Sequence, residues 1–169
     1  MEIRRLGPDD ALVYRALRLR GLAEHPDAFT SSYEDEVLRP IDDTLRRLDP
    51  DGDDAVYGAF VDGVLAGAAG LGRERRPKNR HKATVFGMYV APEYGRRGVG
   101  ADLVRHLIVV ARHEAGVEQL VLTVTETNAA ARGLYERLGF RAFGVEPRAI
   151  RIGDTYFGKT HMILFLDRP

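Results

Sequence analysis

A glycine- and arginine-rich loop between an apolar strand and a helix is the feature that most constrains how this chain can fold. The run Gly87–Gly100 (GMYVAPEYGRRGVG) starts apolar, turns at Pro92 and opens into a segment with helical periodicity. Glycines permit positive φ angles and close approach of a ligand to the backbone. A helix N-terminus presents unpaired N–H groups. The order strand, loop, helix therefore predicts that several backbone N–H groups converge on one spot, where a phosphate can bind.

The glycine spacing alone is weak evidence for such a site. The pattern G-x-x-G-x-G occurs at residues 95–100 and again at residues 67–72. The second copy lies in a predicted strand with no helix after it, so we interpret its glycines as sites of close packing or a strand bend. An ordinary tight turn is the alternative for the first copy. Neither copy fits a Walker A loop or the dinucleotide-binding fingerprint.

Hydrophobic periodicity predicts an α/β fold with a mixed sheet. Strands are expected at residues 3–6, 55–61, 64–71, 84–90, 119–125 and 140–145, and helices near 8–23, 42–48, 99–115 and 129–138. Residues 151–166 are expected to form a last strand pair or one long irregular strand. Asp62-Gly63 is typical of a type I′ hairpin turn. No internal repeat or low-complexity linker interrupts the pattern, so residues 1–169 are expected to form one domain.

Composition excludes some classes of chemistry. The chain has no cysteine, so disulfides, thiolate metal sites and cysteine-borne covalent intermediates are excluded. The formal net charge is zero, so no global field favours nucleic acid or a membrane. The N-terminus does not resemble a signal peptide, and no apolar run approaches the length of a membrane span. We therefore expect a cytoplasmic protein.

A second segment, Asn128–Phe140, follows the loop along the chain. Asn128 is placed to cap an alanine-rich helix and Gly139 to follow its end, with Leu134 and Leu138 facing the core. Tyr135 lies seven residues after Asn128, which brings it to nearly the same helix face about 10 Å further along the axis. One extended ligand could contact both side chains. The alternative is that Tyr135 is an ordinary core or boundary residue.

Together the two segments resemble the GNAT superfamily of N-acetyltransferases. The run Met88-Tyr89-Val90, followed by Pro92-Glu93-Tyr94 and Arg97-Gly98-Val99-Gly100, is similar to that family's acetyl-CoA loop. The run Asn128-x-x-Ala131-Arg132-x-Leu134-Tyr135-x-x-x-Gly139-Phe140 is similar to its second coenzyme motif. The resemblance covers most of the chain. It implies a single-domain α/β fold in which about six or seven strands form a mixed central sheet flanked by about four helices.

The resemblance also implies a function and a set of site residues. The family transfers acetyl directly from acetyl-CoA to an amine, without an acyl-enzyme and without a metal. The backbone of Met88 and Val90 would line the acetyl and pantetheine part of the coenzyme, with the Val90 N–H as an oxyanion donor. Asn128 would contact the pantetheine arm, and Tyr135 would protonate the departing thiolate. The full expected coenzyme-binding set is Met88, Tyr89, Val90, Gly95, Arg96, Arg97, Gly98, Val99, Gly100, Ala101, Asn128, Ala131 and Tyr135.

The loop departs from the family pattern at two positions. The family usually has Gln or Arg three positions before the glycine matched by Gly98, and a glycine one position later. Here those positions hold Gly95 and Arg96. Because most contacts of this loop are expected from main-chain N–H groups, binding should survive. The backbone conformation at Arg96 is in question, since non-glycine residues with positive φ are uncommon.

The residues leave the catalytic base and the acceptor open. Glu126, between a strand and the Asn128 helix, is the first candidate base; His81, Glu34 and a water molecule are alternatives. The acceptor, a small molecule or a protein, would be shaped by Tyr14, Phe29 and the Ser31-Ser32-Tyr33 run. The basic segment 73–82 holds six Lys or Arg residues. We interpret it as a solvated hairpin tip; docking of an acidic acceptor, of RNA or of the coenzyme's phosphate is the alternative.

Two other functions compete with catalysis. The first is a non-catalytic acetyl-CoA-binding sensor or interaction module, which would bind the coenzyme and release no thiol. The second is an RNA-associated protein that works through the basic segment 73–82. Nucleic acid is disfavoured because no aromatic residue interleaves the basic ones. A homodimer through the last strands is an expectation from the resemblance alone.

Overall fold

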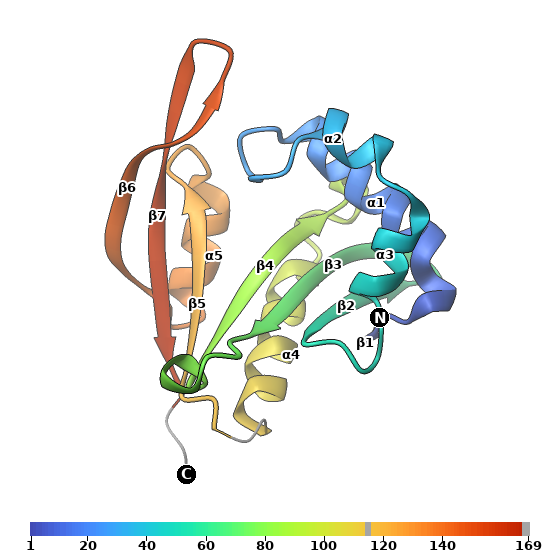
Figure 1. Ribbon diagram of the computed structural model, residues 1–169, viewed down its shortest axis with the longest axis horizontal. Helices are drawn as coiled ribbons and strands as arrows, with labels where there is room; N and C mark the ends of the chain where they lie inside the picture. The colour runs from blue at the N-terminus through green and yellow to red at the C-terminus, as the bar shows by residue number, and fades with distance from the viewer. Residues whose placement is uncertain (114–115, 167–169) are drawn as a thin grey trace.

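The chain folds around one seven-stranded sheet. A computed structural model describes residues 1–113 and 116–166. The strand order is β1-β2-β3-β4-β5-β7-β6, and each neighbouring pair is antiparallel except β4 and β5, which are parallel (Figure 1). The strands are β1 (Glu2–Arg5), β2 (Asp54–Val61), β3 (Val64–Arg73), β4 (Lys82–Val90), β5 (Gln119–Thr125), β6 (Arg141–Ile152) and β7 (Thr155–Phe165). This confirms the predicted mixed α/β fold.

Helices cover both faces of the sheet. Those on one face are α1 (Ala11–Glu24), α2 (Tyr33–Leu38) and α3 (Ile41–Arg47), and those on the other are α4 (Val99–His113) and α5 (Ala129–Arg137) (Figure 1). Short 3-10 turns lie at Pro8–Asp10, Pro77–Asn79 and Pro92–Tyr94. The sheet therefore separates two cores. The α4 core contains Leu103 and Leu107, which are fully buried, and the α1 core contains Leu22 and Leu48.

Local sequence signals account for several elements. Asp62 and Gly63 have φ angles of 51° and 79°, so both central residues of the β2–β3 turn lie in the left-handed region that a type I′ turn requires. The glycines at 67–72 lie inside β3, and a Cβ added to Gly70 would overlap the Phe86 ring. The interpretation of these glycines as close-packing positions is confirmed.

Three expectations about element boundaries were incomplete or wrong. Helix α2 was not predicted; it begins because Ser32 Oγ accepts a hydrogen bond from the Asp35 N–H at 3.1 Å. The sixth strand runs on to Ile152 rather than ending near residue 145, because the chain reverses only at Gly153, where φ is +57°. Residues 151–152 thus belong to β6, and the last strand is β7 alone. The expected end of the fourth helix at residue 115 lies outside the described residues.

Strand β6 forms an edge of the sheet, and most of its residues are exposed. Phe143 and Val145 on this strand are 62% and 56% exposed. The homodimer through the last strands stays a prediction. In the part of the chain that the structure describes, each helix is too short or too polar to cross a bilayer.

A bulge in β4 shapes the centre of the sheet. Ala68 pairs with Tyr89 and Gly70 with Phe86, so Gly87 and Met88 together oppose one residue of β3. Gly87 adopts a φ of +62°, which suits glycine. The extra residue inverts which side chains face which core. Before the bulge Val85 packs in the α4 core, whereas after it Tyr89 packs in the α1 core.

Strands β4 and β5 are paired only over their first residues. Their ladder joins Lys82 to Gln119, Ala83 to Leu120 and Thr84 to Val121, and does not continue beyond these pairs. The remaining residues of the two strands therefore do not pair with each other. Figure 1 shows them diverging toward the end of the molecule where α5 begins.

Candidate active site

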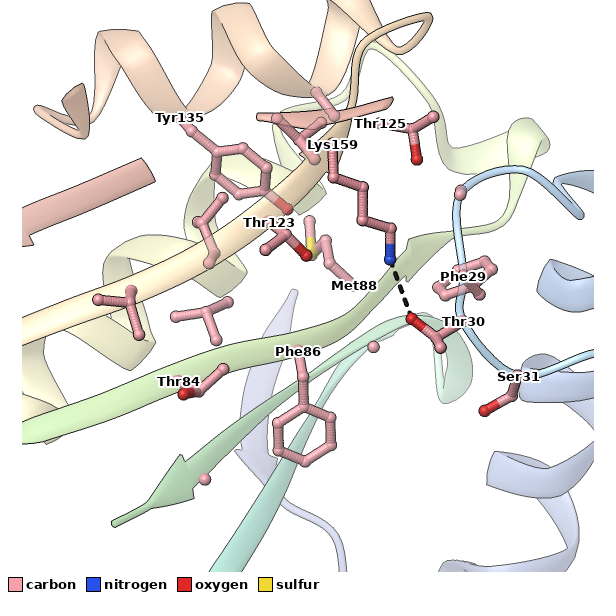
Figure 2. A pocket seen from close by; sticks show the side chains of 18 of the residues that line it. Phe29, Thr30, Ser31, Thr84, Phe86, Met88, Thr123, Thr125, Tyr135 and Lys159 are labelled. Carbon is pink, nitrogen blue, oxygen red and sulfur yellow. Dashed lines mark hydrogen bonds between the residues drawn. The ribbon is translucent and has the colours of Figure 1, made fainter. Parts of the chain in front are cut away.

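The gap between β4 and β5 opens into a cavity of about 730 Å³ that reaches both faces of the sheet. Residues 84–88 of β4 and 121–125 of β5 form its sides. On the α5 side it is lined by Asn128, Ala131 and Tyr135. On the α1 side it is lined by Tyr14, Arg18, residues 28–31 and Arg47. Figure 2 shows Tyr135 and Met88 pointing into this space from one side and Phe29, Thr30 and Ser31 facing it from the other.

Tyr135 is both a core residue and a cavity residue. It is only 6% exposed and packs against Phe140, with ring centroids 5.8 Å apart. Among the described residues its hydroxyl has no hydrogen-bond partner. Burial raises the pKa of Tyr135 to about 12, so the phenol stays protonated at neutral pH. A neutral hydroxyl that faces a cavity is a suitable proton donor.

Asn128 starts α5 as its N-cap, as the sequence predicts. Its Oδ1 accepts a hydrogen bond from the Ala131 N–H at 3.0 Å. The carboxamide nitrogen remains available as a donor. At the other end of the helix, Gly139 has a φ of +95° and its N–H bonds to the Glu136 carbonyl at 3.1 Å. Leu134 and Leu138 are both half-buried, and Leu138 packs against the α4 core as expected.

The loop before α4 has the backbone conformation of an anion cradle. Arg96 and Gly98 have φ angles of +59° and +81°, and Gly95 between Pro92 and Arg96 is extended. Left-handed residues that alternate with ordinary ones turn successive N–H groups toward a common point. The question raised at Arg96 is answered: the arginine takes the left-handed conformation. A Cβ at Gly95 would come within 2.9 Å of the Pro92 carbonyl oxygen, so a glycine fits there.

The first turn of α4 connects this loop to the cavity. A Cβ added at Gly100 would lie 3.0 Å from Met88 Cε and 3.5 Å from Leu134 Cδ2. The start of α4 is therefore packed between β4 and α5. Met88 and α5 line one end of the cavity, and the start of α4 packs against both; residues 89–101, which include the loop, are not part of the cavity lining.

The backbone of Val90 also faces the gap. The Ala91 N–H donates to the Ala66 carbonyl of β3 at 2.9 Å. Because successive N–H groups in a strand point to opposite edges, the Val90 N–H points away from β3, toward the side from which β5 has separated. It can donate to a group that enters the gap.

Some predicted site residues lie elsewhere. The Tyr89 side chain packs over Gly21 in the α1 core, and its hydroxyl donates to Glu24 at 2.5 Å. Glu126 is exposed and does not line the cavity; its N–H donates to the Gly158 carbonyl at 3.0 Å. Glu34 on α2 and His81 before β4 also lie outside the cavity lining. Because none of these three residues lines the cavity, each is a weak candidate for the catalytic base.

Several side chains that line the cavity were not predicted from the sequence, among them Arg18, Phe86, Lys159 and His161. Lys159 reaches from β7 to the segment after α1 and donates to Thr30 Oγ1 at 2.9 Å (Figure 2). His161 Nε2 lies 3.2 Å from Glu146 Oε2. A signal existed for Arg18, which lies four residues after Tyr14 on the buried face of α1. The last two come from a strand whose register with β5 the sequence does not specify.

The basic segment 73–82 lies at the other end of β4 from the loop. Lys82 and Val90 are the two ends of the nine-residue strand β4, on the order of 25 Å apart. Contact with a phosphate held by the loop is therefore ruled out for the tip of this hairpin. Arg73 and Glu74 at its base do line the cavity, so a role toward the acceptor remains open.

Comparison with known proteins gives consistent relatives. The [Ribosomal protein bS18]-alanine N-acetyltransferase of Escherichia coli (strain K12) is 48% identical over 59 residues, which are 35% of this chain and 39% of that protein. The L-amino acid N-acetyltransferase AaaT of the same organism is 32% identical over 97 residues, 57% of this chain and 59% of that protein. The chain thus covers less than two thirds of these curated relatives.

The fold matches solved acetyltransferases along nearly its whole length. The crystal structure of a GNAT-family acetyltransferase from Streptococcus pneumoniae superimposes with a TM-score of 0.85 at 25% identity, covering 98% of this chain and 99% of that one. The sequence model of the acetyltransferase (GNAT) family matches residues 19–140, which include the loop, the β4–β5 gap and α5. The chain belongs to the GNAT acetyltransferase family.

Proposed function

We propose that this protein is an acetyl-CoA-dependent N-acetyltransferase that moves an acetyl group directly to a primary amine. One observation carries the proposal. A protonated, buried phenol, Tyr135, faces the cavity in the β4–β5 gap, and the first turn of α4, directly after the loop, packs at Gly100 against Met88, which lines the same cavity. Pure coenzyme binding does not need a proton donor at that position.

The residues present fit the coenzyme. The N–H groups of residues 95–101 would hold its pyrophosphate, helped by the positive end of the α4 dipole. Arg96 and Arg97 add positive charge beside them. Met88 and Val90 of β4 would flank the pantetheine arm, and the free carboxamide nitrogen of Asn128 would donate to it. The bulge at Gly87 supports this arrangement because it turns Met88 toward α5.

The chemistry assigns a role to three groups of this chain. Acetyl-CoA supplies the activated acetyl group. The Val90 N–H donates to the oxygen on which negative charge develops. The Tyr135 hydroxyl donates its proton to the sulfur that departs. His161, held by Glu146 at 3.2 Å, is the cavity-lining candidate to accept a proton from the incoming amine.

The acceptor is an amine whose identity the relatives leave open. Their names specify a ribosomal protein alanine in one case and an L-amino acid in the other. Both are primary amines, in keeping with a transfer that needs only an accessible nitrogen.

Free-thiol release from acetyl-CoA, measured across pooled amines, tests the proposal. A blank without acceptor corrects for hydrolysis, and Tyr135→Phe serves as the matched variant. We expect acceptor-dependent release that falls in the variant. Binding of acetyl-CoA by calorimetry, with no release for any small-molecule, peptide or protein amine, would instead identify a coenzyme sensor.

A further inference from the structure

Arg18 on α1 lines the cavity, and its guanidinium has no hydrogen-bond partner among the described residues. Its Nε and Nη1 atoms are buried, and neither bonds to any residue in the ranges 1–113 and 116–166. The guanidinium carbon lies 4.7 Å from the centre of the Phe29 ring. The third nitrogen, Nη2, is not among the buried atoms. A molecule in the cavity can reach the charge through this nitrogen.

An unpaired cation in this position is unfavourable for folding. Burial is the largest influence on the pKa of Arg18 and lowers it. The charge of Arg47 acts in the same direction, and Tyr14 and Glu36 oppose it without reversing the shift, yet a guanidinium stays protonated in proteins. Desolvating a charge is costly unless an opposite charge or hydrogen bonds compensate it. The stacked Phe29 ring compensates only part of this cost.

The nearby Arg47 makes the contrast clear. It lines the same end of the cavity, but Glu36 Oε1 lies 3.5 Å from its Nη1 and Asp54 attracts it as well. Glu36 also contacts Arg39 at 3.8 Å. The carboxylates at this end of the cavity are therefore engaged by other arginines. Arg18 has neither an ion pair nor a hydrogen bond among the described residues.

The cavity wall as a whole carries an excess of cationic groups. Among its Lys, Arg, Asp and Glu side chains, four are cationic and two are anionic: Arg18, Arg47, Arg73 and Lys159 against Asp54 and Glu74. A ligand that carries a negative charge would offset this excess of positive charge and would pair with the Arg18 guanidinium.

We infer that the acceptor is a small molecule that carries a carboxylate as well as the reacting amine, as a free amino acid does. The carboxylate binds Arg18 Nη2 while the amine lies at the β4–β5 gap. A single negative charge matches Arg18, the cavity-lining guanidinium that has no hydrogen bond or ion pair in the described part of the chain. The N-terminus of a polypeptide lacks such a carboxylate. This inference rests on the proposed acetyltransferase function of the same cavity.

Matched pairs of acceptors test the inference. Thiol release is measured for a panel of free L-amino acids and for their carboxamides, which keep the amine and lose the negative charge. The variants are Arg18→Met and, as a control, Arg46→Met. Arg46 lies next to Arg47, but its side chain is 75% exposed and does not line the cavity.

The wild type should use the free acid with a kcat/KM about tenfold or more above that of the carboxamide, which is the usual contribution of one hydrogen bond to a charged group. Arg18→Met should lose that preference by slowing the free acid alone, while Arg46→Met should keep it. Carboxamides that react as well as the acids in the wild type, or an equal loss for both acceptors in Arg18→Met, would overturn the inference.

Thermal unfolding gives a readout that does not depend on turnover. Arg18→Met should melt a few degrees above the wild type, because an uncompensated charge is removed. Excess amino acid from the panel should raise the melting temperature of the wild type but not that of the variant. If no amine gives thiol release, the proposed acetyltransferase function is refuted. The ligand-induced shift in melting temperature then still shows whether Arg18 binds a carboxylate. A lower melting temperature of Arg18→Met, or no ligand-induced shift in the wild type, would contradict it.

Discussion

Removing the Tyr135 hydroxyl should separate catalysis from stability. The phenol is 6% exposed, faces the cavity and has no hydrogen-bond partner among the described residues, so Tyr135→Phe breaks no contact within the fold. We therefore expect the free energy of unfolding to change by less than about 1 kcal/mol, or the melting temperature by less than about 3 °C. Loss of a general acid typically slows a reaction about 10²- to 10⁴-fold, which corresponds to about 2.7 to 5.5 kcal/mol.

The assay compares kcat, the KM for acetyl-CoA and the melting temperature of the two proteins. We expect a large fall in kcat, little change in the KM for acetyl-CoA and an intact fold. A kcat within threefold of the wild type, at saturating acceptor and with chemistry shown to limit the rate, would remove Tyr135 as the acid. A large loss of stability would show that the hydroxyl makes a structural contact.

The same substitution has a predicted signature at alkaline pH. The pKa of Tyr135 rises from 10.0 to about 12 on folding, so the folded state holds its proton more tightly than the unfolded state. Its favourable contribution is complete below pH 10 and is lost as the pH rises toward 12. The difference is about 2.7 kcal/mol. Denaturant titrations should show the wild type losing about this much more stability than Tyr135→Phe over that range; parallel losses would contradict the burial argument.

Three further changes test other parts of the site. Gly98→Glu should abolish acetyl-CoA binding, because it adds a strained side chain and a negative charge to the loop. The control variant Gly153→Glu, at a similarly positive φ in the β6–β7 turn, should bind acetyl-CoA normally. Calorimetry measures the binding affinity of both variants. His161→Gln should lower kcat/KM about a hundredfold, while Glu126→Gln should change it less than threefold. The reverse result would restore Glu126 as the base. Gly87→Ala should lower the free energy of unfolding by roughly 1 kcal/mol, because the φ at this position is +62°. It should also raise the KM for acetyl-CoA, since it disturbs the bulge that orients Met88. An unchanged KM would argue against that role of the bulge.

The elements with local signals were predictable from the sequence. The β2–β3 hairpin follows from Asp62-Gly63, and the α5 boundaries follow from Asn128 and Gly139, because each residue acts on the backbone beside it. The loop before α4 was also recognisable, since strand, glycines and helix start are contiguous. The sequence also drew attention to the backbone at Arg96, where a non-glycine residue takes a positive φ.

Features that depend on long-range pairing were not predictable. The β4 bulge requires the register of β3 against β4, and nothing near Gly87 distinguishes it from a glycine in a regular strand. The cavity wall joins α1 to β7, more than a hundred residues apart, so Lys159 and Thr30 meet only in the folded chain. Glu126 looked well placed because it is next to Asn128 in sequence, but the strand end directs it toward Gly158 instead.

A crystal structure of the protein with coenzyme A would test the proposed coenzyme site. We expect the pyrophosphate to lie against the N–H groups of residues 95–101. We also expect the pantetheine arm to pass between β4 and β5 and the sulfur to lie about 3–3.5 Å from the Tyr135 hydroxyl. Coenzyme bound away from the β4–β5 gap, or a sulfur far from Tyr135 with the arm ordered, would contradict it.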